Sequence, residues 1–538
     1  MMHRSRWKLF SLALGLLLLL AACESGSNRQ QQPNPNSESS QQSDQPSGEP
    51  AGGGTLNVAY PANPATLDPH LTTNQATRDV ARNIYEQLVT LNKNYEVVPQ
   101  LAESYEISED GKVYTFHLRK GVHFHNGKEM KAEDVVASME KWLSTSTQGQ
   151  ANLQGAKFLQ TDEYTVQLTL QKPSLVALYV LADTAPFPGI MPKEVIESAG
   201  PEGIKEYIGT GPYKLEEWKT DQYVHLKKFA DYSAVDAEPS GLSGKKYAYL
   251  DDIYFRYVTD ESTRVAGILS GEYDVAFGVP FDNADQIDAT EGVSNYFSPG
   301  GIVAYVFNKK AGPFANQKLR QAFNTALNNE EALTAAYSDS RFFELDSSLA
   351  LPSQKDWYST AGSDKYNLHD IEAAKKLVAE SGYAGEEVVI LTTRDYPEQY
   401  NLAVVAQEVL KSIGVKSRLD VYDWPTVQER RKDENNFDLF AVSFATRATI
   451  HQYPFLDSKA DYPGWTNSPE IDRLLDQIQA SSSIEEAKPL IDELNRVTWD
   501  YLPIVKIGNI QNLVAIRDHV KGLDDLIGPI LWNVSLSR

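Results

Sequence analysis

Two arginines follow segments that we expect to be buried strands, and both could bind an anionic group of a ligand. Arg394 follows the apolar segment 388–392 and precedes a predicted helix, and Arg447 follows the apolar segment 437–444. Open α/β sheets bind ligands at the carboxyl ends of their strands, and a guanidinium can hold a carboxylate through two parallel hydrogen bonds. We therefore expect both arginines to contact an anionic ligand. The alternative for each is an ion pair with an acidic neighbour at the surface.

Motifs of catalytic and nucleotide-binding sites are incomplete in this sequence. The segment 241–244 (Gly-Leu-Ser-Gly) lacks the spacing of a nucleophile elbow, and Gly244-Lys245 lacks the rest of a phosphate-binding loop. His123 and His125 share one face of an extended segment, but no third metal ligand is near them in the sequence. We therefore predict a protein that is not an enzyme and that holds no metal or other cofactor. A secreted hydrolase stays open as a weaker alternative.

Strand and helix patterns are mixed along the chain, which predicts an α/β protein. Apolar and polar residues alternate from Tyr164 to Leu170, as in a strand with one buried face. The segment from Tyr105 to Leu118 alternates in the same way around Ser108-Glu109-Asp110-Gly111, which is typical of a turn, so it predicts a hairpin.

A strand-helix-strand unit is expected around Arg394. Apolar residues recur at helical spacing from Leu402 to Ile413, between the strand 388–392 and an alternating segment at 415–421. Gly414 lies where a helix end favours a left-handed residue. A second helical face includes Leu319 and Phe323, and Ser468-Pro469 is typical of a helix start.

The composition is that of a folded, acidic protein. Of the 538 residues, 41% are hydrophobic and 23% are charged, and the formal net charge is -23. A charge of this sign disfavours nonspecific binding to nucleic acid or to anionic lipid, so we predict no nucleic-acid partner.

The N-terminus has the pattern of an export signal. Basic residues precede a short apolar run from Leu9 to Leu20, and Leu20-Ala21-Ala22-Cys23 resembles the lipobox of bacterial lipoproteins. We predict a signal peptide at 1–22, lipidation of Cys23 and an extracytoplasmic protein that contacts the membrane through this anchor alone. A conventional signal peptide with a free thiol at Cys23 is the alternative. Residues 23–54 are rich in Ser, Gln, Asn, Pro and Gly, which predicts a flexible tether.

A dense series of short motifs lies between Tyr85 and Trp142. Its elements are Pro99, Leu101-Ala102-Glu103, Asp110-Gly111-Lys112, Phe116, Leu118-Arg119, Gly121, Phe124, Asn126-Gly127 and Asp134-Val135. Further elements are Gly209-Thr210-Gly211-Pro212-Tyr213, Pro313-Phe314, Leu319-Arg320-Gln321-Ala322 and Gly464-Trp465-Thr466-Asn467. This series resembles the bacterial extracellular solute-binding proteins of the peptide and nickel class over nearly the whole predicted ordered chain.

The resemblance implies a two-lobed, type II periplasmic-binding-protein-like α/β fold with a ligand cleft between the lobes. It implies three structural domains: domain I at 55–78, 208–299 and 504–538, domain II at 79–207 and domain III at 300–503. It further implies a monomer that captures a small solute, expected to be a short peptide, and delivers it to the transmembrane subunits of an ABC permease.

The resemblance also suggests ligand contacts, with one departure. Arg394 resembles the arginine that dipeptide-binding members use for the ligand carboxylate. Peptide-binding relatives carry an aspartate after the strand that corresponds to 437–444, whereas the segment 445–454 here contains Arg447 and no acid. Either Arg447 binds an anionic or blocked ligand, such as an opine, an oligosaccharide or a phosphorylated solute, or another acid, such as Asp423 or Asp457, reaches the amine. The remaining candidate contacts are Tyr60, Tyr305, Phe307, Asn308, Trp424, Phe444, Ala445, Thr446 and Trp465.

Overall fold

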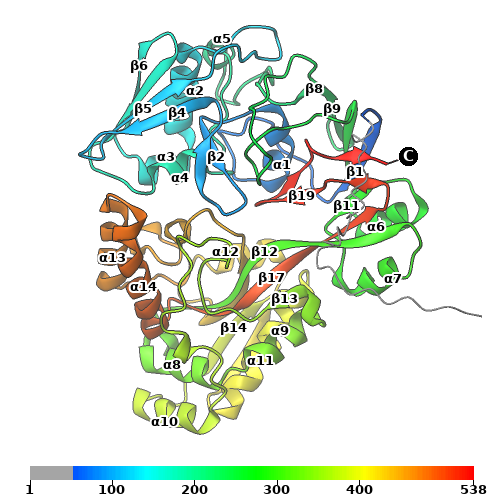
Figure 1. The fold of residues 1–538 in the computed structure, drawn as a ribbon. Helices are drawn as coiled ribbons and strands as arrows, with labels where there is room; N and C mark the ends of the chain where they lie inside the picture. Colours follow the sequence, from blue (N-terminus) through cyan, green and yellow to red (C-terminus); the bar gives the residue numbers. More distant parts are fainter. Residues whose placement is uncertain (1–51, 538) are drawn as a thin grey trace, which may run out of the picture. The chain divides into compact units, whose positions relative to one another are not determined.

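A mixed sheet of eleven strands runs through residues 52–537, the part of the chain that the computed structural model describes (Figure 1). The predictions for the signal peptide, for Cys23 and for nearly all of the tether lie outside these residues. In spatial order the strands are β15 (Ser417–Val421), β14 (Val388–Thr392), β16 (Leu439–Phe444), β12 (Val293–Phe307), β17 (Ile504–Arg517), β11 (Val275–Phe277), β1 (Thr55–Tyr60), β10 (Asp252–Tyr257), β9 (Tyr223–Lys228) and β8 (Tyr213–Lys219), and β13 (Phe343–Glu344) pairs with β17.

The two long strands β12 and β17 connect the two ends of this sheet. They are antiparallel from Val293 opposite Arg517 to Val306 opposite Ile504, with a register shift between Pro299 and Gly301. On one side of the shift β17 also pairs with β11, and on the other side β12 also pairs with β16. A bulge bends a strand and increases its twist, so the direction of the sheet changes at this point. The parts of the sheet on either side of the bulge belong to different lobes.

A separate antiparallel sheet lies in the segment between β1 and β8. Its order is β4 (Ala102–Ile107), β5 (Val113–Leu118), β7 (Thr165–Thr169) and β6 (Lys157–Asp162). The predicted hairpin is confirmed: β4 pairs with β5, and the Gly111 amide closes the turn on the Ser108 carbonyl at 2.8 Å. Every second residue of β5, Tyr114, Phe116 and Leu118, is buried, as the alternating pattern predicts.

The predicted strand-helix-strand unit is confirmed in the second lobe. β14 and β15 are parallel neighbours, and α11 (Pro397–Ser412) connects them. Leu402, Ala406 and Leu410 are buried, because residues four apart lie on one face of a helix. Gly414 has a φ of +80°, the left-handed conformation expected after the helix end.

Helices flank both sheets. The first lobe carries α1 (Gln75–Ile84), α2 (Ala132–Thr145), α3 (Thr147–Asn152), α4 (Ala177–Leu181), α5 (Lys193–Glu197), α6 (Glu261–Ser270) and α7 (Ala284–Asp288). The second lobe carries α8 (Gln317–Ala326), α9 (Asn329–Tyr337), α10 (Ile371–Ser381), α11, α12 (Trp424–Arg430), α13 (Pro469–Ala480) and α14 (Ile484–Tyr501). As predicted, Ser468 caps α13 by accepting a hydrogen bond from the Ile471 amide. No helix within residues 52–537 has the length and apolar character that a bilayer crossing needs.

Three small two-stranded sheets complete the described fold. They are β2 (Val89–Leu91) with β3 (Val97–Pro99), β18 (Val520–Lys521) with β21 (Ser535–Leu536), and β19 (Asp524–Asp525) with β20 (Pro529–Ile530). The architecture is the two-lobed α/β fold expected from the sequence. The three-domain division stays a prediction. Its boundary at 503/504 falls at the start of β17, whose first residues pair with the part of β12 that follows the bulge.

Candidate functional site

A cavity of about 690 Å³ opens where β12 and β17 pass between the lobes. The first lobe contributes the end of β1, the start of α1 and the segment 277–282 after β11. The second lobe contributes the end of α9, the segment 395–398 at the start of α11 and the end of β16. The bulge residues Pro299 and Gly300 and the facing part of β17 lie between these two groups. The cavity is therefore lined by both lobes and by the strands that connect them.

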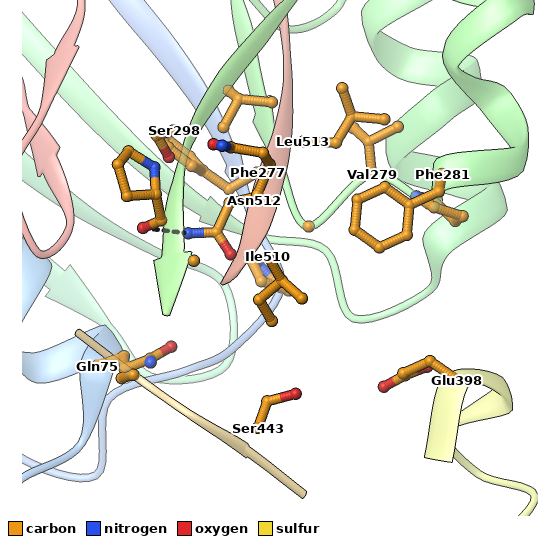
Figure 2. Close-up of a pocket in the computed structure, with 18 of the residues that line it drawn as sticks. Gln75, Phe277, Val279, Phe281, Ser298, Glu398, Ser443, Ile510, Asn512 and Leu513 are labelled. Carbon is orange, nitrogen blue, oxygen red and sulfur yellow. Dashed lines mark hydrogen bonds between the residues drawn. The ribbon is translucent and has the colours of Figure 1, made fainter. Parts of the chain in front are cut away.

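The cavity lining combines apolar and polar side chains (Figure 2). The apolar labelled residues are Phe277, Val279, Phe281, Ile510 and Leu513. The polar labelled residues are Gln75, Ser298, Glu398, Ser443 and Asn512, which come from both lobes and from the connecting strands. Such a lining suits a small ligand that has both apolar and polar parts.

Arg78 and Asp79 of α1 form an ion pair on the first-lobe side of the cavity. Arg78 Nε donates to Asp79 Oδ1 at 2.7 Å, and Tyr60 Oη donates to Asp79 Oδ2 at 2.5 Å. Burial is the largest single influence on the pKa of Arg78 and lowers it, but the charge of Asp79, its hydrogen bond and the nearby Tyr60 and Asp525 together raise the pKa above its ordinary value. Within residues 52–537 the two terminal nitrogens of Arg78 donate no hydrogen bond. They are thus available to an anionic group of a ligand.

The cavity is strongly acidic. Its charged lining within residues 52–537 consists of one base, Arg78, and six acids: Asp79, Glu261, Asp282, Asp395, Glu398 and Asp525. Burial raises the pKa of Asp525 to about 6, and the nearby charge of Asp79 acts in the same direction. Burial also raises the pKa of Glu398, and the charge of Glu261 adds to this shift. An excess of negative charge in a cleft attracts positively charged groups.

Three of the predicted contact residues line the cavity: Tyr60, Ala445 and Thr446. Arg394 lies one residue before the lining segment 395–398, and its side chain is exposed. Its Nη2 donates to Tyr400 Oη at 3.1 Å, and its guanidinium lies 4.8 Å from the centre of that ring. In this conformation Arg394 contacts α11, the helix that follows it.

Tyr305, Phe307 and Asn308 lie in the interior of the second lobe. Tyr305 Oη donates to the Leu402 carbonyl at 2.8 Å, and Phe307 packs against Phe314 with ring centres 4.5 Å apart. The side-chain amide of Asn308 donates to the carbonyls of Glu434 and Phe437. These three side chains support the sheet on which the site is built.

The other aromatic candidates lie in aromatic clusters of the second lobe. Trp424 packs edge-on against Tyr396, a lining residue, and its backbone amide donates to Asp395 at 2.6 Å. Phe444 packs against Phe455, and Trp465 stacks on Phe437. Trp424 is therefore close to the lining, whereas Phe444 and Trp465 are packed among other rings.

Arg447 lies at a second place where the lobes meet. Asp183 of the first lobe is 4% exposed, and its Oδ2 accepts a hydrogen bond from Gln452 Nε2 of the second lobe at 2.9 Å. Burial raises the pKa of Asp183 to about 6, and the positive charge of Arg447 opposes this shift. Arg447 thus stabilises a buried carboxylate of the other lobe. Asp423 caps α12 and Asp457 caps the turn at Ser458–Ala460, so both act locally.

The two histidines that suggested a metal have other surroundings. His125 Nε2 lies 3.0 Å from the Gly211 carbonyl, its ring packs against Phe229, and burial lowers its pKa to about 4. Within residues 52–537 no group of three or more His, Cys, Asp or Glu side chains is placed to hold a metal ion.

Sequence reasoning did not identify Arg78, Asp79, Glu261 or Glu398. Each of these residues lies in the first turns of a helix, where charged residues are common, so nothing in the local sequence separates them from surface residues.

Two lobes joined by a pair of crossing strands, with a cavity at the junction, define a two-lobed solute-binding protein. Residues 96–467 match the family model of the bacterial extracellular solute-binding proteins, family 5, and the chain belongs to this family.

Relatives and solved structures agree with this assignment. The probable peptide ABC transporter periplasmic-binding protein y4tO of Sinorhizobium fredii is 29% identical over 498 residues, which cover 88% of this chain and 92% of the relative. The glutathione-binding protein GsiB of Salmonella choleraesuis is 30% identical over 373 residues, covering 68% of this chain and 69% of the relative. The structure of AgaA from A. tumefaciens R10 in complex with agropinic acid has a TM-score of 0.72 and 27% identity, and covers 90% of this chain and 99% of that one.

Proposed function

We propose that the protein is the substrate-binding component of an ABC importer and that it captures short peptides in the cavity between its lobes. The observation that carries the proposal is the cavity itself, because its lining comes from both lobes and from the strands that connect them. Its volume of about 690 Å³ lies within the range of small-ligand sites. Ligand contacts to both lobes would favour the closed arrangement.

The lining supports a peptide as the ligand. A peptide has a polar backbone, side chains that are often apolar, and two charged ends. Apolar lining residues such as Phe277 and Ile510 would pack against the side chains of the peptide, and Arg78 would hold a carboxylate. Arg394 is a second candidate for the carboxylate if its side chain leaves Tyr400 on ligand binding. The names of y4tO and GsiB, which refer to a peptide and to glutathione, point in the same direction.

The proposal also covers the location of the protein and its partner in transport. The export pattern at 1–22 and Cys23 support an extracytoplasmic, lipid-anchored protein. We expect it to act as a monomer. After closure on its ligand, it would dock on the transmembrane subunits of a permease.

A non-peptide solute is the second candidate. The absence of an acid from 445–454 favours it, as does the likeness to AgaA, whose structure contains agropinic acid. Under this alternative the same cavity would take an opine or another polar solute.

Thermal shift measurements separate the two candidates. The purified protein is heated with a panel of di- to pentapeptides and with a set of opines and sugars. Stabilisation by peptides alone supports the proposal, because a ligand that binds only the folded state raises the unfolding temperature. Stabilisation by an opine or a sugar without any effect of the peptides would replace it. Mass spectrometry of the incubated peptides is the control for hydrolysis, and turnover would contradict both candidates.

A further inference from the structure

We propose that Glu398 and Glu261, which face the cavity from opposite lobes, bind the positively charged amino group of the ligand. This inference rests on the proposed function and names the part of the peptide that this side of the cavity recognises. It assigns the carboxylates that the segment 445–454 does not provide.

Glu398 is the half-buried acid of the lining that accepts no hydrogen bond from another described residue. Asp79 is held by Arg78 and Tyr60, Asp395 accepts the Trp424 amide, and Asp525 accepts the Gly528 amide. Within residues 52–537, Glu398 forms no ion pair and no hydrogen bond with another side chain. Figure 2 shows its carboxylate directed into the cavity, on the side where Ser443 lies.

Glu261 acts on Glu398 across the lobes. Glu261 is the first residue of α6 in the first lobe, and Glu398 lies in the first turn of α11 in the second lobe. Burial raises the pKa of Glu398, and the charge of Glu261 raises it further, so the two carboxylates repel each other. An ammonium group between them would remove the repulsion and attract both lobes at once.

Two hydroxyl groups of the lining residues are buried without a hydrogen-bond partner in the described part of the chain. Ser298 and Thr446 both line it, and they are 1% and 4% exposed. Ser298 Oγ and Thr446 Oγ1 have no hydrogen-bond partner within residues 52–537. Buried polar groups without a partner are uncommon in folded proteins. Both oxygens are shielded from solvent in this arrangement, so a ligand would reach them only after their side chains turn toward the cavity. Ser298 belongs to β12 and Thr446 follows β16, so these groups also come from both sides of the junction.

The test is a comparison of two ligands with three variants. The ligands are the peptide that stabilises the wild type most in the thermal panel and the same peptide with an acetylated N-terminus, which carries no charge there. The variants are Glu398→Gln, Glu261→Gln and, as a matched control, Glu408→Gln. Glu408 lies on the same helix as Glu398 and forms an exposed pair with Lys411. Calorimetric titration gives the dissociation constants, and far-UV circular dichroism checks that each variant is folded.

The proposal expects Glu398→Gln to weaken binding of the free-amine peptide about thirtyfold or more, because a buried charged partner of the ligand is lost. Glu261→Gln should weaken it less, since Glu261 is exposed. Neither variant should weaken binding of the acetylated peptide, and Glu408→Gln should change neither constant. Unchanged affinity of Glu398→Gln for the free-amine peptide would overturn the inference and leave the proposed function intact. A wild type that binds no free-amine peptide of the panel would overturn both.

Discussion

Gly301 lies at the bend of β12, and its replacement by alanine tests whether the bulge fixes the connection between the lobes. Its φ is +126°, a conformation that side chains other than hydrogen rarely allow. A Cβ atom on Gly301 would lie 2.0 Å from the Phe444 carbonyl oxygen and 2.9 Å from the carbonyl carbon. Both atoms belong to the backbone of β16, so no side chain can turn away to make room.

The expected loss of stability has two parts. Forcing alanine into this region of φ costs about 1–3 kcal/mol. Relieving the clash also requires β12 to move away from β16 near the Ile302–Phe444 pair, and each hydrogen bond lost there costs about 1 kcal/mol. Together these parts predict that Gly301→Ala lowers the free energy of unfolding by about 2–5 kcal/mol.

Urea unfolding followed by tryptophan fluorescence measures this loss, and Gly385→Ala is the matched control. Gly385 also has a positive φ, +104°, but a Cβ there would meet nothing within 4 Å. The control therefore carries the backbone strain without the clash. The Gly301 variant should lose about 1–2 kcal/mol more than the control, the part assigned to the separated strands. Equal losses in the two variants would refute the reasoning, because the contact with β16 would then contribute nothing.

Other perturbations follow from buried charges. The pKa of Asp183 is about 6 in the folded protein, above its ordinary value of 3.8, so its folded form binds more protons between these values. The contribution of Asp183 to stability therefore falls as the pH rises from about 4 to 6. Asp183→Asn should remove this contribution from the pH profile of the unfolding free energy, measured by urea titrations at several pH values, and leave the contribution of Asp525. An unchanged pH profile would contradict this. Glu86 and Lys246 form a buried ion pair at 2.9 Å, so Glu86→Gln leaves the charge of Lys246 buried without its partner. The variant should lose about 3–5 kcal/mol of unfolding free energy in the same assay, and a loss below about 1 kcal/mol would show that Lys246 is not held away from water. If Arg394 turns into the cavity, Arg394→Ala should weaken the binding of a peptide with a free C-terminal carboxylate by about 2 kcal/mol, measured by calorimetry. Binding of the same peptide with an amidated C-terminus should not change. Equal affinity of variant and wild type for the peptide with the free carboxylate would exclude Arg394 from the site.

Local patterns predicted several elements of both lobes correctly. The unit of β14, α11 and β15 follows from apolar spacing over about thirty residues, and the glycine at 414 marks the helix end. The hairpin of β4 and β5 follows from alternation and turn residues in the same way. These elements are determined by neighbours in the sequence, so one sequence is enough to predict them.

The cavity could not be predicted by the same reasoning. Its charged residues, among them Arg78, Glu261 and Glu398, come from helices that are far apart in the sequence and meet only in the folded chain. The choice of Tyr305 and Phe307 as ligand contacts shows a related limit of sequence patterns. β12 is buried on both faces near its end, so alternation carries no information about which face meets a ligand.

The charges at the junction give a physical reason why closure of the two lobes would depend on the ligand. Without a cation, Glu398 and Glu261 repel each other across the cavity, and this repulsion adds to the effect of burial, the larger cause, in raising the pKa of Glu398. The hydrogen bond between Asp183 and Gln452 holds the lobes together at another point and does not require a ligand. A ligand with an amino group would replace the repulsion between Glu398 and Glu261 by attraction and leave the hydrogen bond between Asp183 and Gln452 unchanged. Because only this difference between the liganded and unliganded states can shift the equilibrium between open and closed lobes, the acidic lining, rather than the direct contact between lobes, would make closure selective.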